Sequence, residues 1–214
     1  MAKLKLLLSV LILAILSQVS SAAQQSAEPF VEGVDYFKVE SQLTDIKDDL
    51  TQLEEVADLE IFYWYGCYAC WQVESAMVNY LADKPDLRVI RTPLVAHVNW
   101  REQAYIQPLM EQLANKVPLP TELDVYQACL ADCSVFQSYE SGRDWLFEQA
   151  EIEDKPIIDE VAIWAAEKNY QNRADSFSIS QVPTIIIKES FVVDANSAKS
   201  ADRMIQIVNY LLTR

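Results

Sequence analysis

The chain has 214 residues, with 17 basic and 32 acidic side chains, a formal net charge of −15 and a single histidine. A surface this acidic repels nucleic acids and acidic membranes, and one histidine excludes a multi-histidine zinc site. We therefore expect no nucleic-acid partner, no metal and no cofactor.

The first 23 residues have the pattern of a secretory leader. Lys3 and Lys5 precede an apolar run over 6–16, and small residues follow up to Ala22 and Ala23, near which cleavage is expected. The run is too short to span a bilayer, which takes ~20 residues, so the mature protein is expected to be soluble, with an uncleaved anchor as the alternative. Export changes how the four cysteines are interpreted, because disulfides persist in oxidising compartments.

The segment 57–95 predicts a strand–helix–strand unit. Residues 57–65 are apolar, β-branched and aromatic without a helical period, which is typical of a buried central strand. Gly66 has the backbone freedom that a turn from strand to helix requires. Apolar residues then recur every three or four positions over 67–82, which is the spacing of a helix. A second strand is expected at 87–95, paired in parallel with the first.

Residues 100–177 contain only helical patterns. We expect helices at 101–116 with a kink at Pro108, at 123–131, at 143–151, and at 157–174 after Pro156. Strands are expected again at 184–188 and 191–193, before a terminal helix at 197–212. The sequence therefore predicts an α/β domain formed by 24–99 and 178–214, interrupted by an all-helical insertion at 100–177.

Cys67 and Cys70 form a C-x-x-C motif on the first turn of the helix that follows the strand. Unpaired N–H groups and the helix dipole favour negative charge there, so the Cys67 thiolate is stabilised and its pKa lowered. Cys70, one turn further in, would be the less exposed, resolving thiol. Two alternatives stay open: a zinc site completed by Cys129 and Cys133, and a purely structural bridge.

A second motif begins the returning strand, Gln181-Val182-Pro183-Thr184. Proline lacks the N–H that a strand ladder uses, so it fits at the first residue of a strand. On its own the motif indicates no more than a strand start. Its combination with an upstream C-x-x-C motif favours a functional position.

These residues resemble the DsbA-like branch of the thioredoxin superfamily, over a stretch from about Glu28 to the carboxyl terminus. The active-site block matches Gly66-Cys67-Tyr68-Ala69-Cys70-Trp71-Gln72-Val73-Glu74, and Glu32-Gly33-Val34-Asp35-Tyr36 resembles an amino-terminal motif of the family. Val182-Pro183 matches the pair formed by valine and a cis-proline. The resemblance implies a thioredoxin fold interrupted by a helical insertion domain.

The resemblance also implies the roles of single residues. Cys67 would attack and form the mixed disulfide, Cys70 would resolve it, and Val182 would offer main-chain hydrogen bonds to an extended substrate segment across Pro183. The substrates would be unfolded or reduced exported proteins, and a DsbB-like membrane partner would reoxidise the dithiol in the periplasm.

Two departures from the family pattern bear on oxidising strength and proton handling. Tyr68 and Ala69 replace the usual Pro-His between the cysteines, so a histidine that stabilises the thiolate is missing. The buried acid that the family carries six residues before the first cysteine falls on Ile61, while Glu60 faces the other side of the strand. Glu74 matches a second acidic position of the family, with a solvated helix residue as the alternative.

Cys129 and Cys133 lie four residues apart, which inside one regular helix is too far for a bridge. Ser134 and Gln137 resemble a capping box, however, which indicates a helix that ends near Asp132. A local structural disulfide then becomes feasible. Two free thiols, or a second redox pair that relays electrons, remain as alternatives. The single histidine, His97, is interpreted as a loop or surface residue.

Three functions follow from these patterns. The first is a monomeric dithiol oxidase that introduces disulfides into substrates through Cys67 and Cys70. The second is a less oxidising reductase or isomerase, which the missing histidine favours. The third is a module that binds extended peptides and has little redox turnover.

Overall fold

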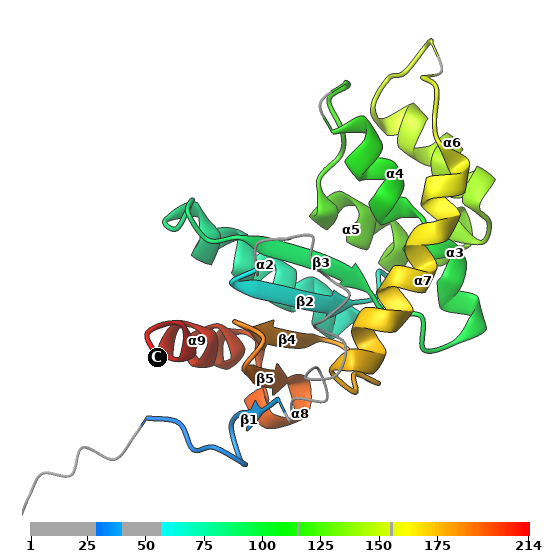
Figure 1. Cartoon of the computed structure of the whole chain (residues 1–214). Coiled ribbons are helices and arrows are strands. Elements are labelled where there is room, and N and C mark those ends of the chain that lie inside the picture. The colour runs from blue at the N-terminus through cyan, green and yellow to red at the C-terminus, as the bar shows by residue number, and fades with distance from the viewer. Residues whose placement is uncertain (1–28, 40–56, 115, 155) are drawn as a thin grey trace, which may run out of the picture.

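The computed structural model describes residues 29–39, 57–114, 116–154 and 156–214 (Figure 1). The expected leader 1–23 and its cleavage site near Ala22 and Ala23 lie outside these ranges. No helix in the described part of the chain is long and apolar enough to cross a bilayer.

A mixed sheet forms the base of the molecule. Its described strands are β1 (Phe37–Lys38), β2 (Leu59–Tyr63), β3 (Val89–Pro93), β4 (Thr184–Ile187) and β5 (Phe191–Asp194), in the order β1-β5-β4-β2-β3. β2 and β3 pair in parallel, which confirms the predicted pairing, whereas the other neighbouring strands pair antiparallel.

The central strand β2 is buried on both faces, which explains its nearly continuous apolar sequence. Leu59 and Ile61 point to the face that α2 (Tyr68–Ala82) and α9 (Ala201–Leu212) cover. Phe62 points to the opposite face and packs against Ala174 and Phe177 at the end of α7. The strand alternation therefore separates two parts of the core.

A block of helices stands beside one end of the sheet, and α7 runs from this block down to the sheet (Figure 1). Between β3 and β4, the described residues form α3 (Arg101–Ala104), α4 (Ile106–Leu113), α5 (Glu122–Asp132), α6 (Tyr139–Gln149) and α7 (Glu160–Ser176), with 3-10 turns at Val98–Trp100 and Cys133–Phe136. Fully buried side chains such as Ile106, Leu146 and Ile163 form its core. An α/β domain interrupted by helices is thus confirmed, while the boundary at 100–177 stays a prediction.

The long helix expected at 101–116 is wrong, because it is divided in two at Tyr105. Pro108 explains the division, since its nitrogen carries no hydrogen for the carbonyl of Ala104. The proline therefore ends one helix and lies in the first turn of the next, instead of kinking a single one.

Three other helix boundaries differ from the predicted ones. Helix α7 begins after Asp159, whose carboxylate accepts a hydrogen bond from the Ala162 N–H at 3.0 Å. Helix α6 begins four residues early, capped by Ser138. The predicted terminal helix is divided into α8 (Ala195–Ala198) and α9 at Lys199, which adopts a left-handed φ of 67°. In each case a cap side chain or a single backbone angle decided the boundary.

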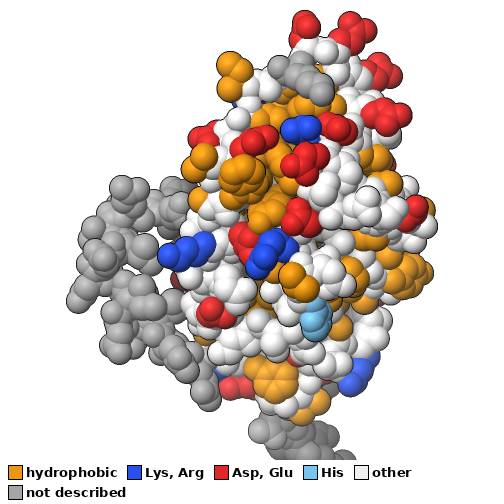
Figure 2. All heavy atoms as spheres, turned by 90° about the vertical axis from the view of Figure 1, so that its right-hand side faces the viewer, with side chains coloured by type: hydrophobic (Ala, Val, Ile, Leu, Met, Phe, Trp, Pro, Cys, Tyr) orange, Lys and Arg blue, Asp and Glu red, His pale blue; other side chains and the backbone are white. Residues whose placement is uncertain are grey.

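Acidic side chains surround hydrophobic ones over the upper, helical part of the face shown in Figure 2. Three of the exposed hydrophobic side chains, Ile157, Val161 and Trp164, lie on or just before α7. The negative charge expected from composition is therefore spread over this surface.

Candidate active site

Cys67 is the N-cap of α2, directly after the turn that follows β2. Its backbone is extended, with φ −94° and ψ 110°, and its Sγ accepts a hydrogen bond from the Cys70 N–H at 3.2 Å. Its carbonyl accepts from the Trp71 N–H at 3.1 Å. The sulfur therefore occupies the position where helix N–H groups are unpaired and negative charge is favoured.

The two thiols of the motif, both free in the structure, have opposite environments. The pKa of Cys67 is lowered to about 7, chiefly by a hydrogen bond from the Cys70 thiol. Burial raises this pKa, and the N–H groups of Cys70 and Ala69 lower it further. Cys70 is only 2% exposed, and burial raises the pKa of its thiol far above the ordinary value. Near neutral pH, Cys67 is therefore available as a thiolate while Cys70 holds its proton.

Tyr68 and Ala69, the residues between the cysteines, contribute in different ways. The Tyr68 side chain is 59% exposed and lies 5.4 Å from the Trp71 ring, measured between centroids. Ala69 acts on Cys67 through its backbone N–H alone. Position 69, which carries a histidine in the DsbA-like family, therefore has no side-chain hydrogen-bond donor in this chain.

Gly66, which has no side chain, lets its backbone lie close to the Trp64 ring. A Cβ at this position would overlap the Trp64 ring, which stacks on Trp100 at 4.4 Å with an interplanar angle of 9°. Trp64 Nε1 also donates to Gln103 Oε1. The glycine therefore allows an aromatic pair to pack beside the turn that leads into Cys67.

Val182 and Pro183 directly precede β4, and the peptide bond between them is cis. The Val182 side chain packs against the same hydrophobic cluster as Cys67 and Trp71. The carbonyl of Pro183 accepts from the Ala195 N–H at 3.2 Å, which ties this turn to the start of α8. The structure thus brings the second motif to the cluster that carries the dithiol.

The acidic residues near the motif are buried. Glu74 is 3% exposed and accepts from Arg91 Nη2 at 2.7 Å and from Arg91 Nε at 3.2 Å, so the interpretation as a solvated helix residue is wrong. Glu60 faces away from Ile61, as strand alternation predicts, and accepts from Thr92 Oγ1 at 2.7 Å and from Arg173. Both carboxylates are therefore held by an arginine.

Cys129 and Cys133 form a disulfide across the end of α5. The helix ends at Asp132, and the turn that begins at Cys133 brings the two Cα atoms to 3.8 Å. A disulfide leaves no thiolate for a metal, and the described residues contain no cluster of three or more His, Cys, Asp or Glu side chains with metal-binding geometry. His97 is exposed and contacts the Trp100 ring edge-on.

A polar network near the motif, buried except for its partly buried member Glu122, was not predicted from the sequence. Tyr65 donates to Glu122 Oε2 at 2.6 Å, and the hydroxyl of Tyr63 lies 3.1 Å from that of Tyr65 and donates to Gln107 Oε1 at 2.7 Å. Strand alternation could have placed Tyr63 and Tyr65 on one face. Gln107 and Glu122 come from the helical block, and nothing in their local sequence points to this contact.

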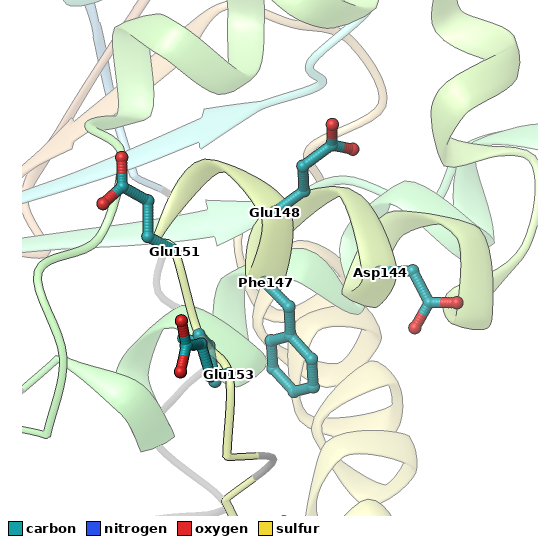
Figure 3. A pocket seen from close by; sticks show the side chains of 6 residues that line it. Asp144, Phe147, Glu148, Glu151 and Glu153 are labelled. Atoms are coloured by element: carbon teal, nitrogen blue, oxygen red, sulfur yellow. The ribbon is translucent and has the colours of Figure 1, made fainter.

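The helical block also has a surface hollow of about 480 Å³, which Figure 3 shows from close by. Its carboxylates point in different directions and so do not converge on one point (Figure 3). None of the residues around it belongs to the two motifs; they are Asp144, Phe147, Glu148, Glu151, Ile152 and Glu153. The hollow is therefore not formed by either of the two motifs.

Known proteins of similar sequence and fold are thiol:disulfide interchange proteins named DsbA. No family model matches the chain. The thiol:disulfide interchange protein DsbA of Pseudomonas aeruginosa is 22% identical over 205 residues, which cover 94% of this chain and 92% of the relative. The crystal structure of Pseudomonas aeruginosa DsbA superimposes with a TM-score of 0.66 at 16% identity, covering 87% of this chain and 95% of that one. The chain is DsbA-like.

A second solved structure shares the fold of this DsbA-like chain. It is Proteus mirabilis DsbA with a non-covalently bound peptide, PWATCDS, with a TM-score of 0.61 at 16% identity over 86% of this chain and 99% of that one. The similarities confirm the predicted thioredoxin fold with a helical insertion. They also confirm the predicted class of enzyme, a protein thiol–disulfide oxidoreductase.

Proposed function

We propose that this DsbA-like protein is an exported oxidase that transfers a Cys67–Cys70 disulfide to reduced substrate proteins. The observation that carries the proposal is the asymmetry of the two thiols. Cys67 is half-buried at a helix start, with its pKa lowered to about 7, whereas the pKa of buried Cys70 is raised. A couple built in this way has one thiol for exchange with substrate and one that resolves.

The reaction has two exchanges. A substrate thiolate attacks the Cys67 sulfur of the oxidised pair, the Cys67–Cys70 bond breaks, and its electrons go to the Cys70 sulfur, which takes up a proton. A second substrate thiolate then attacks the substrate sulfur of the mixed disulfide, and Cys67 leaves as a thiolate. The substrate is oxidised by two electrons, and the dithiol is left reduced.

For substrate binding, we propose that an extended segment lies along Val182 and Pro183, with its cysteine at Cys67. The packing of Val182 and Cys67 on one cluster supports this arrangement. The non-covalent peptide in Proteus mirabilis DsbA contains a cysteine and supports the same class of substrate. Main-chain pairing is common to all sequences, which would give broad substrate choice.

Location and partners belong to the same proposal. The leader over 1–23 would direct the chain to the periplasm, where a membrane disulfide donor of the DsbB kind would accept the two electrons from the dithiol. We propose a monomer as the working form.

A second candidate is a less oxidising reductase or isomerase, and the pKa of Cys67 favours it. A value of about 7 resembles thioredoxin, for which about 7 is typical, more than DsbA, at about 3.5. A less stabilised thiolate favours the disulfide form, so the couple becomes a weaker oxidant.

Two measurements decide among oxidase, reductase and peptide-binding module. The first is the redox equilibrium of the Cys67–Cys70 couple with glutathione, and the second is oxidation of a reduced two-cysteine peptide by the oxidised protein. Rapid peptide oxidation with a potential well above that of thioredoxin supports the oxidase, and a potential near thioredoxin supports the second candidate. Peptide binding without exchange contradicts both. The Cys70→Ser variant should trap the mixed disulfide on Cys67.

A further inference from the structure

The side chain of Gln181 ties the turn before β4 to the start of α8. Its Nε2 donates to Asp194 Oδ2 at 2.5 Å, and its Oε1 accepts from Asn196 Nδ2 at 2.9 Å. A carboxylate only accepts hydrogen bonds, so Asp194 determines which end of the amide faces it. Both hydrogen-bonding ends of this glutamine therefore bind one neighbouring segment of the chain.

Asp194 is held in place by a strand and by a helix. It ends β5, where it pairs with Thr184 of β4, and it is the N-cap of α8. Its Oδ1 accepts from the Ser197 N–H at 2.7 Å, so its two carboxylate oxygens are divided between α8 and Gln181. The contact therefore fixes the Gln181 side chain relative to both the sheet and the helix.

The other hydrogen bonds of the turn lie on either side of Val182. Thr184 Oγ1 donates to the Gln181 carbonyl at 2.9 Å, and the Pro183 carbonyl accepts from the Ala195 N–H at 3.2 Å. Among the described residues, neither the N–H nor the carbonyl of Val182 makes a hydrogen bond. The turn is thus held by its neighbours, and the main chain of Val182 stays available to a second polypeptide segment.

The position of Val182 matters because its side chain packs on the cluster that contains Cys67 and Trp71. A substrate segment can pair with the Val182 main chain and reach Cys67 only if the turn is in the right place. Where only a fraction of the molecules has the competent arrangement, the apparent affinity falls by that fraction. Contacts that hold the turn therefore act on substrate affinity.

We propose that Gln181 is a positioning residue for the substrate, which holds the Val182 main chain where it can pair with a segment whose cysteine lies at Cys67. Gln181 acts through Val182 and not on the reacting sulfurs. The inference rests on the proposed binding of an extended segment along Val182 and Pro183. A small thiol has no main chain to pair, so its exchange with Cys67 does not depend on Gln181.

Exchange with two reductants of different size tests the proposal on the full chain. The oxidised protein is mixed with a reduced two-cysteine peptide or with dithiothreitol, a small dithiol without peptide bonds. Reduction of the Cys67–Cys70 disulfide is followed by acid quenching, alkylation and mass spectrometry. The dependence of the rate on peptide concentration gives a half-saturating concentration and a maximum rate.

Gln181→Met has a side chain of similar length without the two hydrogen-bonding ends. It should raise the half-saturating peptide concentration about fivefold, the size that corresponds to the typical net contribution of one hydrogen bond. The maximum rate, the rate constant with dithiothreitol and the reduction potential should stay unchanged. The melting temperature should change little, because the Gln181 side chain is exposed.

Two further variants separate this role from a general loss of contacts. Asn196→Ala removes the donor to Gln181 Oε1 and should have a smaller effect in the same direction. Because Asn196 acts through Gln181, the double variant should be no weaker than Gln181→Met alone. Gln171 gives the matched control, since it is an exposed glutamine whose Nε2 donates to Asp175 Oδ1 at 3.0 Å within α7, and Gln171→Met should keep the wild-type kinetics.

The outcomes distinguish the inference from the proposed function. Unchanged peptide kinetics in Gln181→Met overturn the inference and leave the proposed function intact. Equal losses with the peptide and with dithiothreitol also overturn it, since Gln181 would then act on the dithiol and not on the substrate segment. If Gln181→Met does not fold, Asn196→Ala decides the matter by the same two readouts. Failure of the wild type to oxidise the peptide contradicts the proposed function itself.

Discussion

At the scale of single residues, the helix start makes the two thiols unequal. Cys67 receives N–H groups at its sulfur, and Cys70 loses contact with water in the same turn of chain. A helix N-terminus favours negative charge on the first thiol, and burial disfavours it on the second. The same three-residue spacing thus yields a reactive group and a protected one.

Alkylation of the reduced protein tests this inequality. Since the pKa of Cys67 is lowered to about 7, its rate of labelling by iodoacetamide should rise about tenfold per pH unit below 7 and level off above it. Cys70, with a raised pKa and 2% exposure, should stay unlabelled over the same range. Peptide mapping by mass spectrometry provides the measurement. Labelling of Cys70 before Cys67 would contradict the assignment of roles.

Ala69 provides a second test at this scale, through the reduction potential. DsbA lies near about −120 mV and thioredoxin near about −270 mV, and we expect this couple to lie between them. Ala69→His should raise the potential by tens of millivolts, because a stabilised thiolate favours the reduced form, and about 30 mV corresponds to about one pKa unit. Equilibration with glutathione measures it, with Ala69→Gln as a polar control without a cation. An unmoved potential would mean that a side chain at position 69 does not reach Cys67.

At the scale of the elements, Glu74 fixes α2 on the sheet. The helix contributes Glu74 and β3 contributes Arg91, and the carboxylate is almost fully buried. Removing one partner of such a pair leaves the other charge without compensation, which costs more than an exposed ion pair contributes. The orientation of the helix that carries both cysteines depends in part on this contact.

Glu74→Gln should therefore lower the free energy of unfolding by about 3 kcal/mol. The exposed pair formed by Lys38 and Glu32 gives the matched control, since Glu32→Gln should change stability by less than about 1 kcal/mol. Urea unfolding followed by circular dichroism measures both variants. Equal effects of the two substitutions would show that the Arg91 contact does not hold the helix.

At the scale of the whole molecule, the helical block and the sheet are joined on both sides of β2. On one side Tyr65 contacts Glu122, and on the other Glu60 accepts from Arg173 of α7. The active-site segment is thus enclosed by elements that are far apart in the chain. The surroundings of this segment therefore depend on how the helical block packs against the sheet.

The Cys129–Cys133 disulfide lies within the helical block and should act on stability alone. It closes a loop of about five residues, for which chain entropy gives about 2 kcal/mol. The double variant Cys129→Ser/Cys133→Ser should therefore melt about 4–8 °C lower and keep the wild-type reduction potential of the Cys67–Cys70 couple. Thermal unfolding and the glutathione equilibrium provide the two readouts. Loss of substrate oxidation at a temperature where the variant is folded would instead indicate a relay of electrons between the pairs.

The sequence by itself determined the features that depend on neighbouring residues. The strand before Gly66, the C-x-x-C motif at a helix start and the proline that opens β4 could all be predicted, because local periodicity, turn chemistry and helix electrostatics fix them. The break at Tyr105 follows from Pro108 by the same local rule, although the sequence analysis predicted one kinked helix and the structure has two separate ones.

Only the tertiary structure decided which distant side chains share the site. Glu122 lies more than 50 residues from Cys67, and its helix begins with an ordinary capping box, so nothing local separates it from a surface carboxylate. Glu74 was equally ambiguous until Arg91 was placed beside it. The pKa of a carboxyl group depends on burial and on neighbouring charges, and both are set by packing between segments that are remote in the chain.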